Sequence, residues 1–290
     1  MLIGLLKTMR PRQWPKNGFV FIALLFDRQL LIPTSFLHTL AAFILLCLMS
    51  SAVYLMNDLV DIESDRRHPK KRLRPLPAGQ LSIGVARIAA VVFALGSLAA
   101  GFALAIDFGL ILLGYLVMQI AYTFWLKHMV LLDVFVITTG FILRIAAGVT
   151  VIHVQRFSPW LYVFGGFLAL FMALGKRRHE LSLLGNDAHS HRAILNEYSL
   201  DLIDRMLGVV MTSAVVSYSL YTFLAEGLPG NHVMMLTIPF VLYAIFRYLY
   251  LIHIRNEGGA PEEILLRDRP LQITMGLFGV VVFIALYILV

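Results

Sequence analysis

Charged residues are scarce in this chain, and cysteine is almost absent. Only 14% of the 290 residues are Asp, Glu, Lys or Arg, whereas 59% are hydrophobic. This composition excludes an ordinary soluble domain, which needs more charged side chains on its surface, and it is typical of an integral membrane protein. The single cysteine, Cys47, excludes an intrachain disulfide and is most simply a small buried hydrophobic residue.

The N-terminal segment lacks the features of a removable signal peptide. Its first sixteen residues carry Lys7, Arg10, Arg12 and Lys16, and no small-residue cleavage site follows an apolar core. We therefore expect the N-terminus to stay on the side of the membrane where it is made.

Long apolar runs, separated by short polar loops, make up most of the sequence. A helix needs about 20 apolar residues to cross a bilayer. Asp27 and Arg28 interrupt the first run and Pro33 ends it; without this run, an even number of spans would bring both termini to one side. No loop could form a second domain, so we expect one transmembrane domain over residues 1–290. The pattern predicts an all-α bundle of nine membrane-spanning helices, near residues 17–32, 35–58, 83–105, 108–125, 131–152, 159–176, 205–226, 232–253 and 271–290.

Lys and Arg gather in alternate loops. Nine spans place 20 of the 24 Lys and Arg residues on the side of the N-terminus, with Arg28 and Arg156 on the other side and Arg144 and Arg247 inside spans. The positive-inside rule then predicts a multi-pass protein of the cell (inner or plasma) membrane with a cytoplasmic N-terminus. The net charge of +7 fits a basic face beside anionic membrane lipids, so no nucleic-acid partner is expected.

Three aspartates follow one another at the end of the second predicted span. Asp58, Asp61 and Asp65 are spaced i, i+3 and i+7, which places them within roughly 60° of one another on a helix. Carboxylates that converge in this way need a cation among them, and hard oxygen ligands suit Mg²⁺ shared with substrate phosphates. Asn57 can add an amide oxygen. The alternative is a solvated acidic helix end that pairs with nearby Arg and Lys.

A basic loop comes next, and its three prolines prevent a continuous helix. Such cations can neutralise a polyanionic substrate beside the acidic site, although a purely topogenic charge cluster explains the loop equally well. Together, metal ligands and a basic loop indicate a diphosphate. The loop cations are Arg66, Arg67, Lys70, Lys71, Arg72 and Arg74.

A second polar group lies on the fifth predicted span. Asp133 and Arg144 share a helical face with Ile137 and Gly140, within about 60°. An arginine inside a membrane is costly without an anion, so Arg144 is a functional candidate, with a structural ion pair or a clamp on helix-end carbonyls as alternatives. Tyr122 and Lys127 complete this edge or anchor the chain at the membrane interface.

Cations also end the sixth predicted span, as Lys176, Arg177 and Arg178, with Glu180 beside them. A stop-transfer cluster is one interpretation. The other is that an anion with two separated phosphate groups needs cations in two places, with Lys16 as a parallel case at the start of the first span.

Several motifs together resemble one known family. The pattern ND-x-x-D-x-x-x-DR from Asn57, followed by Arg74 and Pro75, resembles the UbiA superfamily of intramembrane transferases. Within it, the chain resembles the decaprenyl-phosphate phosphoribosyltransferase branch over nearly its whole length. The segments that carry this resemblance are RPRQWPKN (10–17), DRRHPKKRLRP (65–75), YTFWLKHMVLLDV (122–134), GFILRIAAG (140–148), GKRRHEL (175–181) and EEILLRDRPLQ (262–272).

The resemblance implies a Mg²⁺-dependent glycosyltransferase for cell-envelope glycan synthesis. Its expected substrates are 5-phosphoribosyl 1-diphosphate and a polyprenyl (decaprenyl-type) phosphate, and Asp58, Asp61 and Asp65 would be the catalytic metal ligands. A homo-oligomer stays open as an alternative to a monomer. The residues expected to bind substrate are Lys16, Asn57, Arg66, Lys71, Arg72, Arg74, Tyr122, Lys127, Asp133, Arg144, Lys176 and Arg177.

The chain departs from part of the superfamily at one position. Members that use prenyl diphosphates resemble one another in a second acidic motif, D-x-x-x-D, whereas here Asp133 is followed at +4 by Ile137. This agrees with a donor other than a prenyl diphosphate. The alternatives are an aromatic prenyltransferase of the same superfamily and an anion transporter, although transporters place their sites near mid-membrane and the polar groups here gather at one edge.

Overall fold

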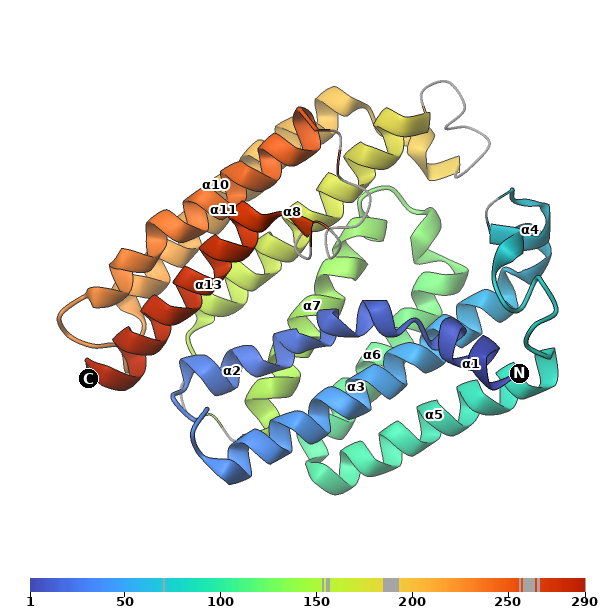
Figure 1. The fold of residues 1–290 in the computed structure, drawn as a ribbon, viewed down its shortest axis with the longest axis horizontal. Coiled ribbons are helices and arrows are strands. Elements are labelled where there is room, and N and C mark those ends of the chain that lie inside the picture. The colour runs from blue at the N-terminus through green and yellow to red at the C-terminus, as the bar shows by residue number, and fades with distance from the viewer. Residues whose placement is uncertain are drawn as a thin grey trace. The chain divides into compact units, whose positions relative to one another are not determined.

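The computed structural model describes residues 1–69, 71–152, 154, 157–184, 193–255, 257, 264 and 267–289. The predicted loop cations Lys70, Arg156 and Arg192, and part of the 262–272 motif, lie outside these residues. The described chain is all-α, as predicted. Its elements long and apolar enough to cross a membrane are α3 (Pro33–Val60), α5 (Ile83–Leu104), α6 (Ile106–Phe124), α7 (Leu132–Val151), α8 (Pro159–Leu184), α10 (Leu200–Leu224), η6 with α11 (Val233–Thr237, Ile238–His253) and α13 with η7 (Arg269–Phe283, Ile284–Ile288) (Figure 1).

Local sequence signals fix where these helices begin. Proline occupies the first turn of α3, α8 and α13, where its missing N–H costs no hydrogen bond. Side-chain oxygens cap three other free N–H groups: Ser82 accepts from Val85 N at the start of α5, and Ser199 and Asp268 do the same for α10 and α13. Eight predicted spans match helices: seven agree within five residues at each end, and α8 continues eight residues beyond the predicted end at 176.

The predicted first span, residues 17–32, is not one α-helix. After α1 (Leu2–Met9) the chain forms a 3₁₀-helix, η1 (Pro11–Val20), and then the short helix α2 (Phe21–Phe26). Pro11 and Pro15 lack the N–H groups that a continuous α-helix needs, and Arg28 turns the chain with a positive φ of 57°. The count of nine membrane-spanning helices is therefore not confirmed: eight qualify among the residues described above.

The segment from Arg10 to Phe21 nevertheless runs antiparallel along most of α3. Its contacts step from the C-terminal end of α3 toward the N-terminal end. In order they join Arg10 to Asp58, Trp14 to Ser51, Asn17 to Cys47, and Phe21 to Phe43 and Phe36.

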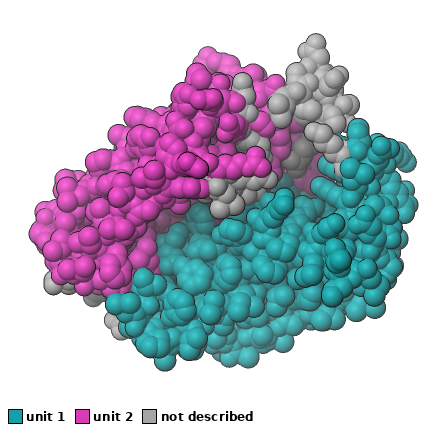
Figure 2. Space-filling model, viewed as in Figure 1, with its two compact units in different colours: residues 1–24, 29–124, 143–153 teal, residues 25–28, 125–142, 154–290 magenta. Residues whose placement is uncertain are grey.

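The chain divides into two compact units (Figure 2). Unit 1 comprises residues 1–24, 29–124 and 143–153; in it α3 packs on α5, α6, α1 and η1. Unit 2 comprises residues 25–28, 125–142 and 154–290; in it α8 packs on α10, and α11 on α13. Helix α7 contributes its first part to unit 2 and its second part to unit 1. The single domain expected over residues 1–290 stays a prediction.

Unit 1 has a packed interior and an apolar outer face. Leu46, Met49 and Leu55 on α3 are fully buried. On α5, by contrast, only 11% of the span is buried, and Ile88 and Leu95 are exposed. An exposed apolar helix face of this length belongs against lipid acyl chains.

Candidate active site

Two of the three predicted metal ligands come together at the end of α3. The helix ends at Val60 and Asp61 forms a bend before α4 (Ile62–Arg67), yet the hydrogen bonds of helical spacing continue, from Asp61 N to Asn57 O (2.9 Å) and from Asp65 N to Asp61 O (2.8 Å). Asp58 and Asp65 are 2% and 1% exposed, whereas Asp61 is only half-buried.

Two arginines bind these buried carboxylates. Arg74 Nη1 donates to Asp65 Oδ2 at 2.6 Å and to Asp58 Oδ1 at 3.3 Å. Arg10 Nη2 donates to the same Asp58 oxygen at 2.5 Å, and its guanidinium lies 4.9 Å from the centre of the Tyr54 ring. Each arginine side chain is 32% exposed, so the cluster is open on its basic side.

The remaining cations of the predicted loop are arranged differently. Lys71, in η2 (Lys71–Leu73), has its Nζ 3.9 Å from Asp65 Oδ1. Arg66 pairs with Glu63 at 2.8 Å on the exposed side of α4, and Arg72 is exposed. The loop is anchored beyond Arg74, because Leu76 and Leu81 are buried against Leu55 and Ala86. The backbone at Arg74 is therefore held in place by the packing of its own loop.

Asn57 and Lys16 have surroundings of their own. Thr123 Oγ1, near the end of α6, lies within hydrogen-bond distance of both Asn57 Oδ1 and Gln119 O, which share its one hydroxyl hydrogen. Lys16 is half-buried in η1. Tyr122 and Lys127, both half-buried, fall in units 1 and 2 respectively, with Lys127 in the 3₁₀-helix η3 (Leu126–His128).

Asp133 and Arg144, the charged residues of the second predicted constellation, have different hydrogen-bond partners. Arg144 lies in unit 1, where its Nε donates to Asn17 Oδ1 at 2.7 Å and its Nη2 to Tyr115 OH at 3.1 Å. Asp133 lies in unit 2 with other partners. Their common helical face spans about three turns, so side chains from different elements reach each residue separately.

Asp133 is the centre of a buried cluster in unit 2. Arg177 Nε donates to its Oδ2 at 2.8 Å, and Tyr198 OH donates to its Oδ1 at 2.7 Å. Arg177 also makes a short bond to Glu180, and Tyr198 OH accepts from Leu131 N at 2.8 Å. Burial and the Asp133 carboxylate raise the pKa of Tyr198 to about 12, so its hydroxyl stays protonated and donates.

Lys176 contrasts with its neighbour Arg177. Arg177 is 2% exposed and engaged by two carboxylates, whereas Lys176 is half-buried and, within the described ranges, forms no ion pair. Of the two cations predicted to bind a second phosphate group, Lys176 has the charge available for an external anion.

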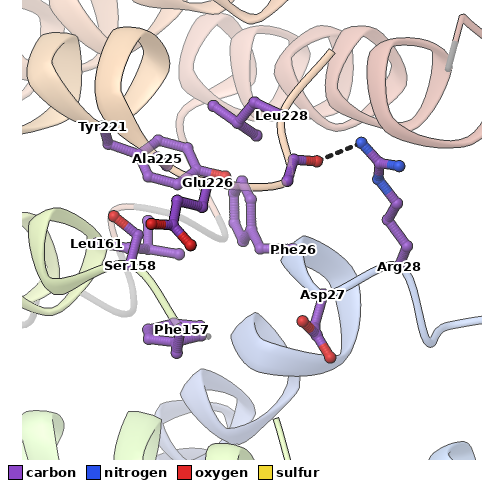
Figure 3. A pocket seen from close by; sticks show the side chains of 11 residues that line it. Phe26, Asp27, Arg28, Phe157, Ser158, Leu161, Tyr221, Ala225, Glu226 and Leu228 are labelled. Atoms are coloured by element: carbon purple, nitrogen blue, oxygen red, sulfur yellow. Dashed lines mark hydrogen bonds between the residues drawn. The ribbon is translucent and has the colours of Figure 1, made fainter. Parts of the chain in front are cut away.

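Unit 2 has a pocket of about 200 Å³ (Figure 3). It lies among the residues that follow α2, the start of α8 and the end of α10. Arg28 points to Gly227 and donates to its carbonyl oxygen. No predicted site residue lines it; its lining is Phe26, Asp27, Arg28, Phe157, Ser158, Leu161, Tyr221, Ala225, Glu226, Gly227 and Leu228.

Residues 18–264 match the model of a family described as the UbiA prenyltransferase family. The chain belongs to this family. The match includes the Asp58–Asp65 cluster and the Asp133 cluster, and Arg10 precedes it. The resemblance in the motifs is thereby confirmed for most of the chain.

Individual members of the UbiA family are similar over almost the whole chain. A decaprenyl-phosphate phosphoribosyltransferase of Mycobacterium tuberculosis is 35% identical over 277 residues, covering 94% of this chain and 91% of that protein. A protein of the same name from Corynebacterium glutamicum is 33% identical over 304 residues, covering 99% and 87%. The solved structure of a UbiA homolog from Archaeoglobus fulgidus bound to DMAPP and Mg²⁺ has a TM-score of 0.74 at 19% identity, covering 98% and 99%, which shows the shared fold.

The carboxylates at the end of α3 have the chemistry of Mg²⁺ ligands that are completed by a substrate. Asp58 and Asp65 offer hard oxygens that face the same Arg74 nitrogen. Among the described residues, however, no three His, Cys, Asp or Glu are grouped to hold a metal on their own. In proteins, Mg²⁺ is usually held by one or two carboxylates, and substrate phosphates supply further ligands to the ion. Asp61 as a third ligand stays a prediction.

Three residues of these clusters were missed by the sequence analysis. Arg10 was read as topogenic charge, but it reaches Asp58 across 48 positions of sequence. Thr123 lies inside the motif segment 122–134 but was not singled out, and Tyr198 lies in a loop that carries no motif. The motif segment 10–17 could have indicated Arg10; nothing in the sequence pairs Tyr198 with Asp133.

Proposed function

We propose that this protein is a decaprenyl-phosphate phosphoribosyltransferase, which transfers a 5-phosphoribosyl group from phosphoribosyl diphosphate to a polyprenyl phosphate. The observation that carries the proposal is the 33–35% identity to proteins of this name over 94–99% of the chain. In the reaction, an acceptor phosphate oxygen forms a bond to C1 of the ribose while the bond from C1 to diphosphate breaks. The product is a polyprenylphosphoryl 5-phosphoribose for cell-envelope glycan synthesis.

The Asp58 cluster is suited to the leaving diphosphate. When bound, Mg²⁺ supplies positive charge that stabilises the developing diphosphate anion. Asp58, Asp65 and Asp61 would hold the metal, and Arg10, Arg74 and Lys71 would donate charge-assisted hydrogen bonds to phosphate oxygens. The acceptor phosphate is already ionised at neutral pH, so this chain does not need a general base.

The cluster around Asp133 would serve the other end of the donor. Phosphoribosyl diphosphate carries a second phosphate across the ribose, which calls for a second basic cluster. Lys176 would bind this phosphate, and Arg177 would hold that end of α8 through Asp133 and Glu180. Ile137, in place of a second aspartate, argues against the rival aromatic prenyltransferase.

The orientation is also part of the proposal. This is a multi-pass membrane protein, because it has eight helices long and apolar enough to cross a membrane among its described residues and belongs to the UbiA family. We place it in the plasma membrane with the N-terminus in the cytoplasm, on the evidence of the basic loops. Because Arg10 contacts Asp58, the Asp58 cluster would then face the cytoplasm, where the water-soluble donor is available.

The test is a direct transfer assay. Purified protein in detergent is incubated with labelled phosphoribosyl diphosphate and a polyprenyl phosphate, with Mg²⁺ or with a chelator. Mg²⁺-dependent appearance of label in the organic phase is expected. Asp58→Asn should abolish it, whereas Asp107→Asn, an exposed aspartate at the start of α6, is the matched control. Prenyl transfer from a prenyl diphosphate to an aromatic acceptor, without ribosyl transfer, would overturn the proposal.

A further inference from the structure

One guanidinium nitrogen lies between the two buried carboxylates of the Asp58 cluster. Arg74 Nη1 is within hydrogen-bond distance of both Asp58 Oδ1 and Asp65 Oδ2. The carboxylate side chains are 3% and 2% exposed, so few other groups can reach them. A metal ion that bridges these two oxygens has to displace Arg74 Nη1.

Arg10 reinforces this arrangement from a second element. It connects α1 to η1 with a φ of 54°, a left-handed conformation that residues other than glycine adopt rarely. Its guanidinium binds the same Asp58 oxygen as Arg74 and lies over the Tyr54 ring. Unusual backbone geometry held in place by packing is a feature of functional sites.

The charges of the cluster disfavour a metal ion on its own. Asp58, Asp61 and Asp65 carry three negative charges, and the cations in contact with Asp58 and Asp65, namely Arg10, Arg74 and Lys71, carry three positive ones. A divalent ion alone would leave two positive charges uncompensated and Arg74 without its carboxylates. A diphosphate brings negative charge with the metal and offers paired oxygens that a guanidinium binds well.

We propose that Arg74 and Arg10 hold Asp58 and Asp65 in such a way that a divalent metal ion binds there only together with a diphosphate. When the metal ion and the diphosphate bind together, the two guanidinium groups release the carboxylates and bind the phosphate oxygens. This inference rests on the proposed function and adds an order to it: metal and donor diphosphate bind as one unit. The arginines position the carboxylates and screen them from free metal.

The experiment measures metal binding without turnover. Full-length protein in detergent is dialysed to equilibrium against Mn²⁺, with or without inorganic diphosphate, with a protein-free chamber as reference. Wild type is expected to bind Mn²⁺ at least tenfold more tightly with diphosphate. Arg74→Gln is expected to bind Mn²⁺ alone at least tenfold more tightly than wild type. Arg67→Gln, an exposed arginine of α4, makes the same charge change and should behave as wild type.

The outcomes separate this inference from the proposed function. Tight Mn²⁺ binding by wild type without diphosphate, or equal binding by wild type and Arg74→Gln, overturns the ordered binding while a Mg²⁺-dependent transferase still stands. Failure of wild type to bind Mn²⁺ even with diphosphate overturns both. If Arg74→Gln does not fold, Arg10→Gln, which frees only Asp58, should show a smaller gain in Mn²⁺ affinity, and no gain overturns the inference.

Discussion

Arg177 donates from Nε to Asp133 Oδ2 at 2.8 Å, and the two side chains are 2% and 0% exposed. The pair joins α8 to the start of α7 inside unit 2, and Tyr198 completes it from the segment before α10. Its depth means that Arg177 cannot be treated as a free phosphate ligand. Its first role is to neutralise Asp133.

We predict that Arg177→Ala strongly destabilises the protein. The substitution leaves the Asp133 carboxylate buried without its cation, and breaking such a pair costs about 3 to 5 kcal/mol. Thermal unfolding in detergent should show a clearly lower midpoint. The double variant Asp133→Asn/Arg177→Gln should recover part of the loss, because no buried charge is left unpaired; a double variant as unstable as the sum of its parts would contradict this.

Lys176→Ala should weaken donor use without unfolding the protein. A charge-assisted contact to phosphate contributes about 1.5 to 3 kcal/mol, so the KM for phosphoribosyl diphosphate should rise about tenfold or more. The KM for polyprenyl phosphate should change much less. Arg205→Ala, which removes an exposed cation paired with Asp201 on α10, is the control. A loss of lipid affinity alone would assign Lys176 to the acceptor instead.

Substitution of each aspartate by alanine should nearly abolish turnover. Asp58→Ala and Asp65→Ala remove oxygens that face Arg74, and Asp61→Ala removes the remaining predicted ligand. Each variant should still insert into the membrane, which gel filtration in detergent checks. Full Mg²⁺-dependent activity in any one of them would remove that residue from the metal site.

The sequence was sufficient for the positions of the long helices, because apolar length, prolines and capping residues are local signals. The sequence was also sufficient to predict that Asp58 and Asp65 lie close together. The helical hydrogen bonds continue through the bend at Asp61, so residues at i and i+7 still share one face. The prediction failed over residues 17–32, where the chain forms the end of the 3₁₀-helix η1 and the short helix α2 instead of one long helix.

Contacts between distant segments could not be derived in the same way. Arg144 and Asp133 share a face of one helix, but their partners, Asn17 and Arg177, come from elements 127 and 44 positions away. Helical periodicity says which side chains share a face and nothing about which other helix meets them. The predicted common face of Asp133 and Arg144 on α7 therefore says nothing about the different partners that the two residues have.

Gly148→Ala should destabilise unit 1. A Cβ at this position of α7 would lie 2.0 Å from Val20 O, so the helix and η1 would have to move apart. Overpacking of this kind costs about 1 to 3 kcal/mol. Gly114→Ala on α6 is the control, since a Cβ there meets nothing within 4 Å and alanine favours the helix. Equal unfolding midpoints for the two variants would show that the close approach is not maintained.

The course of the N-terminal segment along α3 predicts the topology. Arg10 contacts Asp58 near the C-terminal end of α3, and Phe21 contacts Phe36 near its N-terminal end, so the segment must cross the membrane if α3 does. Reporters fused at the N-terminus and inserted after Arg67 should both report the cytoplasm. Reporters inserted between Arg28 and Pro33, or fused at the C-terminus, should report the other side. If the reporter before Pro33 lies on the same side of the membrane as the N-terminus, residues 10–28 do not cross the membrane. The protein would then have eight crossings, with both termini on one side.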